Sequence, residues 1–277
     1  MFESLKNSWE LTKASAAVLR ADKELVLFPL FSTVAVTLVT ASFVLPIFLT
    51  DATDKLASGP LGYVVLFLFY LAQYFVIFFC NSALVGAALI RLRGGDPTLG
   101  DGFRIALGRI GPIFGYALLA ATVGMALRTL QERAGFLGKI VISLLGAAWS
   151  VASFLVVPIL VSEGLGPIDA VKRSVELLKK TWGETLIGSA GIGTVFSWIS
   201  LAAVFGALPL IAVAFIAEAN VVGVVLIGGL VTLLGVLALI SAALTGIYTA
   251  AVFRYAAEGE IGLTFSPAMV RGAFKSK

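Results

Sequence analysis

Four charged side chains at one short amphipathic segment could bind an anion. Glu163 precedes the helical part of this segment, which is predicted to begin at Pro167, and Asp169, Arg173 and Glu176 lie inside it. A guanidinium binds phosphate through two parallel hydrogen bonds, and the first amides of a helix are free to bind anions. Arg173 therefore predicts a headgroup or anion site. The alternative is that Glu163 caps or anchors the helix, which is the commoner role at a helix start.

Basic side chains recur on three segments of this amphipathic type. Each basic residue near an anionic membrane surface contributes about 1 kcal/mol at best, so several together would hold a segment on the membrane. The alternative is that these charges only set the orientation of the chain. The predicted lipid- or anion-binding residues are Lys6, Lys13, Arg104, Lys172, Arg173, Lys179 and Lys180.

Polar side chains are rare inside the apolar runs, and each needs a hydrogen-bonding partner. An unsatisfied buried amide costs about 1 to 3 kcal/mol, so Gln73 and Asn81 either line a polar path or bond to another helix, which is the commoner arrangement. Glu218 would be a proton or cation site inside the bilayer, but Ala219 and Asn220 beside it favour a periplasmic turn. Six hydroxyl residues at helical spacing could line a cavity or bond back to their own helices: Thr33, Thr37, Thr40, Ser241, Thr245 and Thr249.

The composition removes several kinds of chemistry. The chain holds no histidine and one cysteine, Cys80. Histidine-type zinc sites, Ser-His-Asp triads and internal disulfides are therefore excluded. We expect no cofactor, no metal and no catalytic residue.

The same composition is typical of an integral membrane protein. Hydrophobic residues make up 59% of the 277 residues, charged residues make up 13%, and the mean hydropathy is +1.03. Soluble domains are about one quarter charged, and a helix needs about 20 apolar residues to cross a bilayer. The apolar runs exceed that length without alternating in polarity, which predicts an all-α membrane protein. The Lys and Arg residues are spread over membrane edges, so we expect membrane lipids and not nucleic acid as partners.

The helices that position these residues are predicted to form three repeating units. Amphipathic interfacial helices are expected over residues 1–24, 98–109 and 162–182, with Gly111 and Pro112 ending the second. Each precedes a hairpin of two transmembrane helices. The first hairpin is expected over 25–49 and 61–90, and the second over 113–127 and 140–161. The two helices of the third are expected on either side of Glu218, between residues 184 and 254. We thus predict six transmembrane helices in a single domain, with pseudo-repeats over 1–93, 94–161 and 162–256 and a cytoplasmic tail over 257–277.

The last two apolar runs are longer than one crossing. Tilt, a re-entrant part or a helix extending beyond the bilayer must absorb the excess, and Pro209 is the expected break. Three pairs of small residues permit close approach of helices, within one chain or between copies of it: Gly111 and Gly115, Ser82 and Gly86, and Ala242 and Gly246. A homo-oligomer or an unidentified protein partner is compatible with these pairs.

Each predicted interfacial helix has an apolar stripe suited to the headgroup layer. The stripes consist of Phe2, Leu5, Trp9, Thr12 and Ala16, of Phe103, Leu107, Ile110 and Phe114, and of Ile168, Val171, Val175, Leu178 and Trp182. Sixteen of the 20 Lys and Arg residues lie in the N-terminal segment, in the connections after the second and fourth spans, and in the tail. Because cytoplasmic loops carry an excess of Lys and Arg, both termini and all three interfacial helices are predicted to be cytoplasmic, which in a bacterium means the inner membrane.

One run of residues resembles the signature of a group of uncharacterised bacterial multi-span proteins. It consists of Val157-Pro158, then Glu163-Gly164-x-Gly166-Pro167-x-x-Ala170-x-x-Arg173-Ser174-x-x-Leu177-Leu178, then Trp182. The N-terminal Ser8-Trp9-Glu10-Leu11 and Leu19-Arg20-Ala21-Asp22-Lys23-Glu24-Leu25 resemble the family catalogued as domain of unknown function 6159. The amphipathic pattern is distantly similar to the membrane domain of some glycerophosphodiester phosphodiesterases, whose catalytic domain has no counterpart here. The resemblance implies six spans and no established activity.

Two functions fit these features. The first is transport or permeation of a neutral, lipidic or amphipathic solute, because repeated hairpins place equivalent helices around a centre and the spans hold few charges. The alternative is a non-catalytic membrane scaffold or lipid-interacting accessory protein on the anionic inner leaflet. An intramembrane enzyme is the least supported class, since the spans hold no paired acids and no nucleophile beside a base.

Overall fold

The computed structural model describes residues 2–49, 59–180 and 185–259, and places the side chains of residues 12–49, 59–179 and 192–259. All regular structure in these residues is helical. In chain order the elements are α1 (Phe2–Ala21), the 3-10 helix η1 (Lys23–Val26), α2 (Leu27–Leu49), α4 (Pro60–Leu92), α5 (Leu99–Gly108), α6 (Ile110–Arg133), α7 (Phe136–Ala152), α8 (Val156–Ser162), α9 (Pro167–Lys180), α10 (Thr185–Ile216) and α11 (Asn220–Glu258).

Six helical stretches are long and apolar enough to cross a membrane, as the sequence predicts. They are Lys23–Leu49, Pro60–Leu92, Ile110–Arg133, Phe136–Ser162, Ile192–Ile216 and Asn220–Glu258. Helices that follow one another in the chain pack together, α2 with α4, α6 with α7, and α10 with α11. The protein is therefore a multi-pass, all-α membrane protein.

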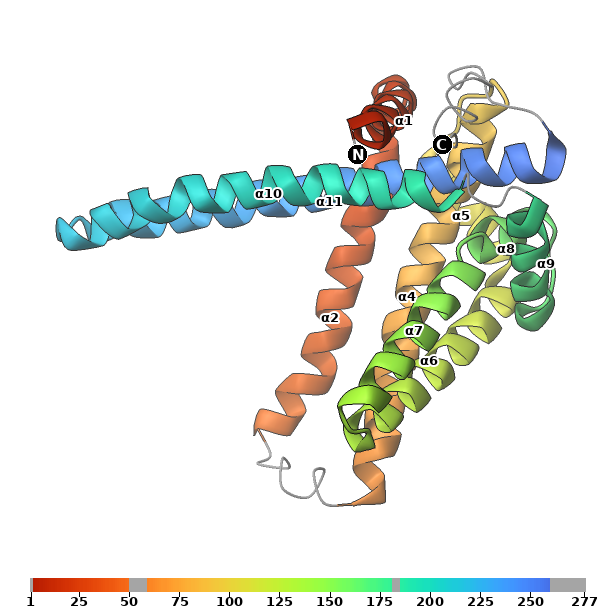
Figure 1. Cartoon of the computed structure of the whole chain (residues 1–277), viewed down its shortest axis with the longest axis horizontal. Coiled ribbons are helices and arrows are strands. Elements are labelled where there is room, and N and C mark those ends of the chain that lie inside the picture. The colour runs from red at the N-terminus through yellow and green to blue at the C-terminus, as the bar shows by residue number, and fades with distance from the viewer. Residues whose placement is uncertain (1, 50–58, 181–184, 260–277) are drawn as a thin grey trace.

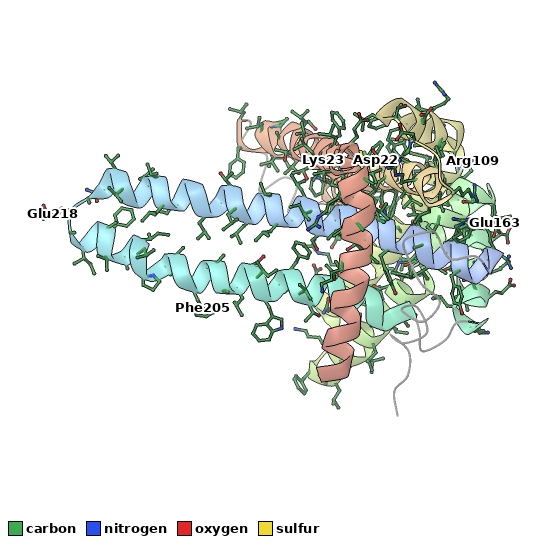
Figure 2. The ribbon with its side chains drawn as sticks, turned by 90° about the horizontal axis from the view of Figure 1, so that it is seen from above. Asp22, Lys23, Arg109, Glu163, Phe205 and Glu218 are labelled. Carbon is green, nitrogen blue, oxygen red and sulfur yellow. The ribbon has the colours of Figure 1, made fainter. Side chains whose placement is uncertain are left out.

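The third pair of long helices runs in a different direction from the first two. Figures 1 and 2 show α10 and α11 side by side, extending away from the rest of the molecule and across the direction of α2. The shorter helices α1 and α5 lie where α2 begins and α4 ends, while α9 packs against α6, α7 and α8. The placement of α1, α5 and α9 in the headgroup layer remains a prediction.

The core lies where the second half of α4, most of α8 and the second half of α11 meet. Buried residues include Ala83 to Leu89 on α4, Val156 to Val161 on α8 and, on α11, Ala243, Leu244 and Gly246 to Arg254. Many of these residues are small, so the helix axes can approach closely. A methyl group added at Gly86 would lie 3.0 Å from Ile105 of α5, and one added at Gly246 would lie 2.4 Å from Leu84. Two of the predicted small-residue pairs thus mark real helix contacts.

Helix α11 absorbs its excess length by having two different halves. Its 39 residues span about 58 Å at 1.5 Å per residue, roughly twice the thickness of a bilayer core. The half after Ala243 is buried in the core, and most of the half before it is exposed and apolar. Both long C-terminal helices, α10 and α11, are continuous over the residues that the structure describes.

Prolines break the chain at other places than the sequence predicts. Helix α10 continues past Phe205 and through Pro209 as far as the turn at Glu218 (Figure 2), because a long apolar helix tolerates the loss of one hydrogen bond. The predicted fourth span is instead divided into α7 and α8 at residues 153–155, since the ring of Pro158 clashes with the carbonyl four residues earlier. Helices α5 and α6 are separated at Arg109 and not at Pro112. Pro112 lies in the first turn of α6, where its missing amide leaves no hydrogen bond unmade.

The predicted apolar stripes take part in packing against the rest of the protein at some positions and are exposed at others. Thr12 on α1 and Leu178 on α9 are buried, and Phe103 on α5 packs against Phe28. On α9 the buried side chains are Ala170, Ser174, Leu177 and Leu178, whereas Ile168 is 60% exposed. On α5 the buried residues are Gly102 and Ala106, and Leu107 is 57% exposed. Small residues pack inward because they allow backbones to approach. Some larger apolar side chains, such as Leu107 and Ile168, are instead exposed on the outward face.

Candidate functional site

A pocket of about 730 Å³ lies between α2, α4 and α11. Small residues on α11 leave this space open, and α11 touches α4 at its floor, where Gly246 faces Leu84. The lining consists of Phe28, Pro29, Ser32, Thr33, Ile77, Cys80, Asn81, Leu84, Gly235, Ala238, Leu239, Ser241, Ala242, Thr245, Gly246 and Thr249. None of these lining residues carries a charge, so the pocket is apolar with a few neutral polar groups.

Four of the six hydroxyl residues predicted from the sequence line this pocket, namely Thr33, Ser241, Thr245 and Thr249. The hydroxyl of Thr33 donates to the carbonyl of Pro29 at 2.9 Å, and that of Thr245 donates to the carbonyl of Ser241 at 2.8 Å. Both expectations therefore hold together. The hydroxyls of Thr33, Thr245 and Thr249 bond back to their own helices, and these residues also line the pocket.

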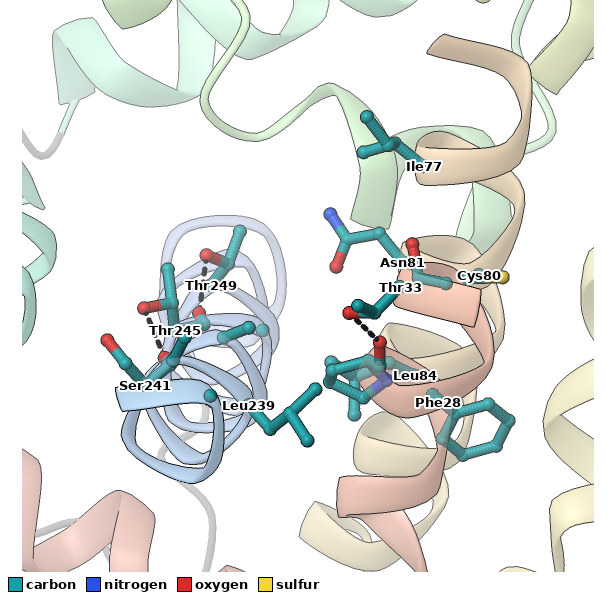
Figure 3. A pocket seen from close by; sticks show the side chains of 16 residues that line it. Phe28, Thr33, Ile77, Cys80, Asn81, Leu84, Leu239, Ser241, Thr245 and Thr249 are labelled. Atoms are coloured by element: carbon teal, nitrogen blue, oxygen red, sulfur yellow. Dashed lines mark hydrogen bonds between the residues drawn. The ribbon is translucent and has the colours of Figure 1, made fainter. Parts of the chain in front are cut away.

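The two amides inside α4 have different surroundings. Gln73 donates to the hydroxyl of Thr40 at 2.7 Å and so joins α4 to α2, which is the interhelical role expected as the more common one. Asn81 forms no hydrogen bond with the residues that the structure describes, and it extends into the pocket in Figure 3. Asn81 is thus available to a ligand, whereas Gln73 is engaged in packing.

Glu218 lies at the far tip of the α10–α11 hairpin (Figure 2). It is exposed and has a φ of 59°, and its amide donates to the carbonyl of Phe215 at 3.1 Å. This geometry is a turn, as Ala219 and Asn220 predict. The side of the membrane that the turn faces remains a prediction.

Glu163 and Arg173 form an ion pair that joins the end of α8 to α9. The Nε atom of Arg173 lies 3.3 Å from both carboxylate oxygens of Glu163, and its Nη1 atom lies 3.4 Å from Glu176. The chain turns between these helices at Gly164, whose φ of 66° favours glycine, and the guanidinium of Arg109 packs over this glycine. These contacts support the anchoring role of Glu163.

The predicted basic residues lie on three separate helices and do not form one cluster. Arg104 pairs with Asp101 on α5 at 3.1 Å, and Lys172 pairs with Asp169 on α9 at 3.2 Å. Lys13 on α1 and Lys179 on α9 are exposed. The side chains of Lys6 and Lys180 lie outside the described residues, as do residues 181–184 with Trp182. Binding of anionic lipid by this set remains a prediction.

Two buried polar groups near the end of α4 were not predicted from the sequence. Arg254 on α11 is 9% exposed, donates to the carbonyl of Leu92 and pairs with Glu258 at 3.1 Å, while Glu258 also pairs with Arg93 at 2.5 Å. This network fastens α11 to α4. Its one signal in the sequence is that Arg254 closes the last apolar run.

Asp22 is the second of these groups, at the junction of α1 and η1. Its Oδ2 atom is buried without a partner in the described residues. Burial raises the pKa of this carboxyl above its ordinary value of 3.8, although Arg91 opposes the change. By contrast, hydrogen bonds from Thr98 lower the pKa of exposed Asp101 in the capping box that begins α5.

Hydroxyl oxygens, one free amide and apolar walls can hold a neutral molecule by hydrogen bonds and burial. In the described part of the chain, no three His, Cys, Asp or Glu side chains are grouped so that they could hold a metal ion.

Comparison with known proteins identifies a family without an assigned activity. The model of a family of unknown function, DUF6159, matches residues 60–263, about three quarters of the chain. No curated protein matches the chain. The chain belongs to this family, and its function has to be inferred from its own geometry.

Proposed function

We propose that this member of the DUF6159 family binds an uncharged amphipathic or lipid-like molecule between α2, α4 and α11 and moves it across the membrane. The lining of the pocket carries this proposal, because it combines apolar walls with neutral hydroxyl and amide groups. A charged solute would lose its hydration there without meeting a counter-charge, which is costly in a low-dielectric environment. A neutral solute avoids that cost.

The surroundings of the pocket support access from the bilayer. Exposed apolar side chains continue from the pocket along α2 and along the outer half of α11, including Phe31, Val34, Leu233 and Val236. In a membrane these faces would contact acyl chains. A molecule dissolved in the bilayer would then reach the pocket sideways without passing through water.

The proposal includes a location and a class. The excess of Lys and Arg in the N-terminal segment, in two connections and in the tail supports a bacterial inner membrane with both termini in the cytoplasm. We infer a non-enzymatic role, supported by the absence of histidine and by the lack of charge in the pocket lining.

Transbilayer movement of a fluorescent glucosylceramide in proteoliposomes tests the proposal. This lipid is uncharged and rich in hydroxyls, and a reducing agent added outside the vesicles quenches only the outer leaflet. The wild type should accelerate movement, and Ala242→Phe, which fills the pocket, should abolish the acceleration. Ala202→Phe is the matched control, because Ala202 is exposed on α10 away from the lining. A well-folded wild type that moves neither this lipid nor other neutral amphiphiles would reject transport.

A second candidate is the lipid-interacting scaffold, which the outward faces of α5 and α9 favour. Each helix leaves a larger apolar side chain and a basic residue exposed, Leu107 with Arg104 on α5 and Ile168 with Lys172 on α9. Such a face can lie in an anionic headgroup layer.

Electron paramagnetic resonance with spin-labelled lipids tests this second role. Combined Gln substitution of Lys172, Arg173, Lys179 and Lys180 should reduce the preference for spin-labelled phosphatidylglycerol over phosphatidylcholine. Combined Gln substitution of Arg133, the last residue of α6, and of Lys139, in the first turn of α7, is the control for charge. An unchanged preference in the α9 variant would count against the scaffold role.

A further inference from the structure

The polar groups of the pocket differ in what they can offer a ligand. The hydroxyls of Thr33, Thr245 and Thr249 each donate to a carbonyl of their own helix, at distances of 2.8 to 2.9 Å. A hydroxyl has one proton to donate and two lone pairs that accept. Because these three protons are engaged, the three oxygens face the pocket as acceptors.

Asn81 supplies what the threonines lack. Its side chain extends from α4 into the space facing Thr245 and Thr249 on α11 (Figure 3), and it bonds to no described residue. An amide offers two N–H donors and one acceptor. Gly246 keeps this space open, since a methyl group there would lie 3.5 Å from the Oδ1 atom of Asn81.

We propose that this pocket selects lipids that carry a free hydroxyl group, such as a diacylglycerol or a long-chain alcohol. The ligand hydroxyl would accept a hydrogen bond from Asn81 and donate its proton to the oxygen of Thr245 or Thr249. An ester or ether oxygen can only accept, so it uses Asn81 and leaves the threonine oxygens unpaired. This selectivity rests on the proposed function, because it requires a ligand in this pocket.

The size of the pocket fits a headgroup and the beginning of its chains. A volume of about 730 Å³ lies within the range of small-molecule sites, about 300 to 1,000 Å³. The remaining length of the chains would lie along the exposed apolar faces of α2 and α11. The hydroxyl would thus be inside and the chains would point towards the bilayer.

Competition for a photoreactive lipid tests this selectivity. Full-length protein in nanodiscs of phosphatidylcholine is labelled with a dioleoylglycerol that carries a diazirine in one acyl chain, and labelled peptides are mapped. Unlabelled dioleoylglycerol should compete at a concentration about tenfold lower than its O-methyl ether. Methylation removes the proton that the ligand hydroxyl donates, and it leaves the oxygen of Thr245 or Thr249 without a hydrogen bond from the ligand. Asn81→Leu and Thr245→Val should each reduce this difference. Thr232→Val is the matched control, since Thr232 bonds back to Gly228 on the same helix but lies outside the lining.

The outcomes separate this inference from the proposed function. Equal competition by the alcohol and its ether in the wild type would overturn the selectivity for a hydroxyl while leaving a neutral pocket intact. Labelling that maps outside α2, α4 and α11 would overturn the pocket as the site, and with it both proposals. The wild-type comparison needs no substitution, so a variant that misfolds does not affect it.

Discussion

Replacing Gly246 with alanine tests the contact between α4 and α11 that forms the floor of the pocket. The added methyl carbon would lie 2.4 Å from Cδ2 and 3.0 Å from Cγ of Leu84. Both distances are shorter than van der Waals contact, so either Leu84 or α11 must shift by about 1 Å. Leu84 is 2% exposed and lines the pocket. Either its side chain moves into the pocket, or α4 and α11 separate.

The magnitude follows from two opposing terms. Overpacking of a filled core costs about 1–3 kcal/mol. The greater helix propensity of alanine returns about 0.5–1 kcal/mol of that cost. Gly235→Ala on the same helix gains only the second term, because no atom lies within 4 Å of its added methyl group. The free energies of unfolding of the two variants should therefore differ by about 1–3 kcal/mol.

Reversible unfolding in mixed micelles with increasing dodecyl sulfate, followed by far-ultraviolet circular dichroism, measures this difference. Leu84→Ala removes the colliding atoms, so in that background Gly246→Ala should lose its penalty, with a coupling energy of about 1–3 kcal/mol. Equal effects of the two glycine substitutions, or simple additivity with Leu84→Ala, would refute the close contact at Gly246.

Two further predictions concern buried polar groups. Ser174→Ala should lower the free energy of unfolding by about 1–3 kcal/mol, because the amide of Leu155 donates to the Ser174 hydroxyl at 3.2 Å and would lose its partner. Ser150→Ala on exposed α7 should change the free energy of unfolding by less than about 0.5 kcal/mol. Similar losses in both variants would contradict the role of Ser174. Asp22→Asn should stabilise the protein at neutral pH, since the raised pKa of Asp22 means that the folded state favours its neutral form. This gain should shrink as the pH falls through the raised pKa towards 3.8, and a gain that grows with acidity in unfolding titrations would contradict the assignment.

The sequence predicts the helices well where one local signal decides. Gly166 and Pro167 place the start of α9 correctly, because proline at the first helical position loses no hydrogen bond. The six long apolar runs likewise become six helical stretches, of which the fourth is divided into α7 and α8, since a backbone in hydrocarbon must satisfy its own hydrogen bonds. Gly246 and Gly86 predict close contacts because only small residues permit them.

The relative placement of the helices could not be predicted in this way. Helices α10 and α11 are apolar all round, so they have no polar face that would indicate their direction relative to α2. The sequence also gives no separate signal for the faces of α5 and α9 that pack against the protein. In a membrane the largest apolar residues can face lipid, and small residues such as Gly102 and Ala170 face the protein.

The candidate site shows the same division. The spacing of Thr245 and Thr249 predicts a hydroxyl face, but the pocket forms only because α11 crosses α2 and α4 at that face. The contacts of Arg254 with Leu92 and of Glu258 with Arg93 join residues more than 160 positions apart. No local pattern in one sequence reports such a contact.

Native mass spectrometry of the purified protein tests most directly whether the pocket holds a neutral lipid-like molecule. The wild type and Ala202→Phe, released gently from detergent, should each carry an added mass that chromatography identifies as an uncharged lipid. Ala242→Phe should lack this mass while keeping its helical content. The same added mass at the same occupancy in all three proteins, or a folded wild type without any, would contradict the account.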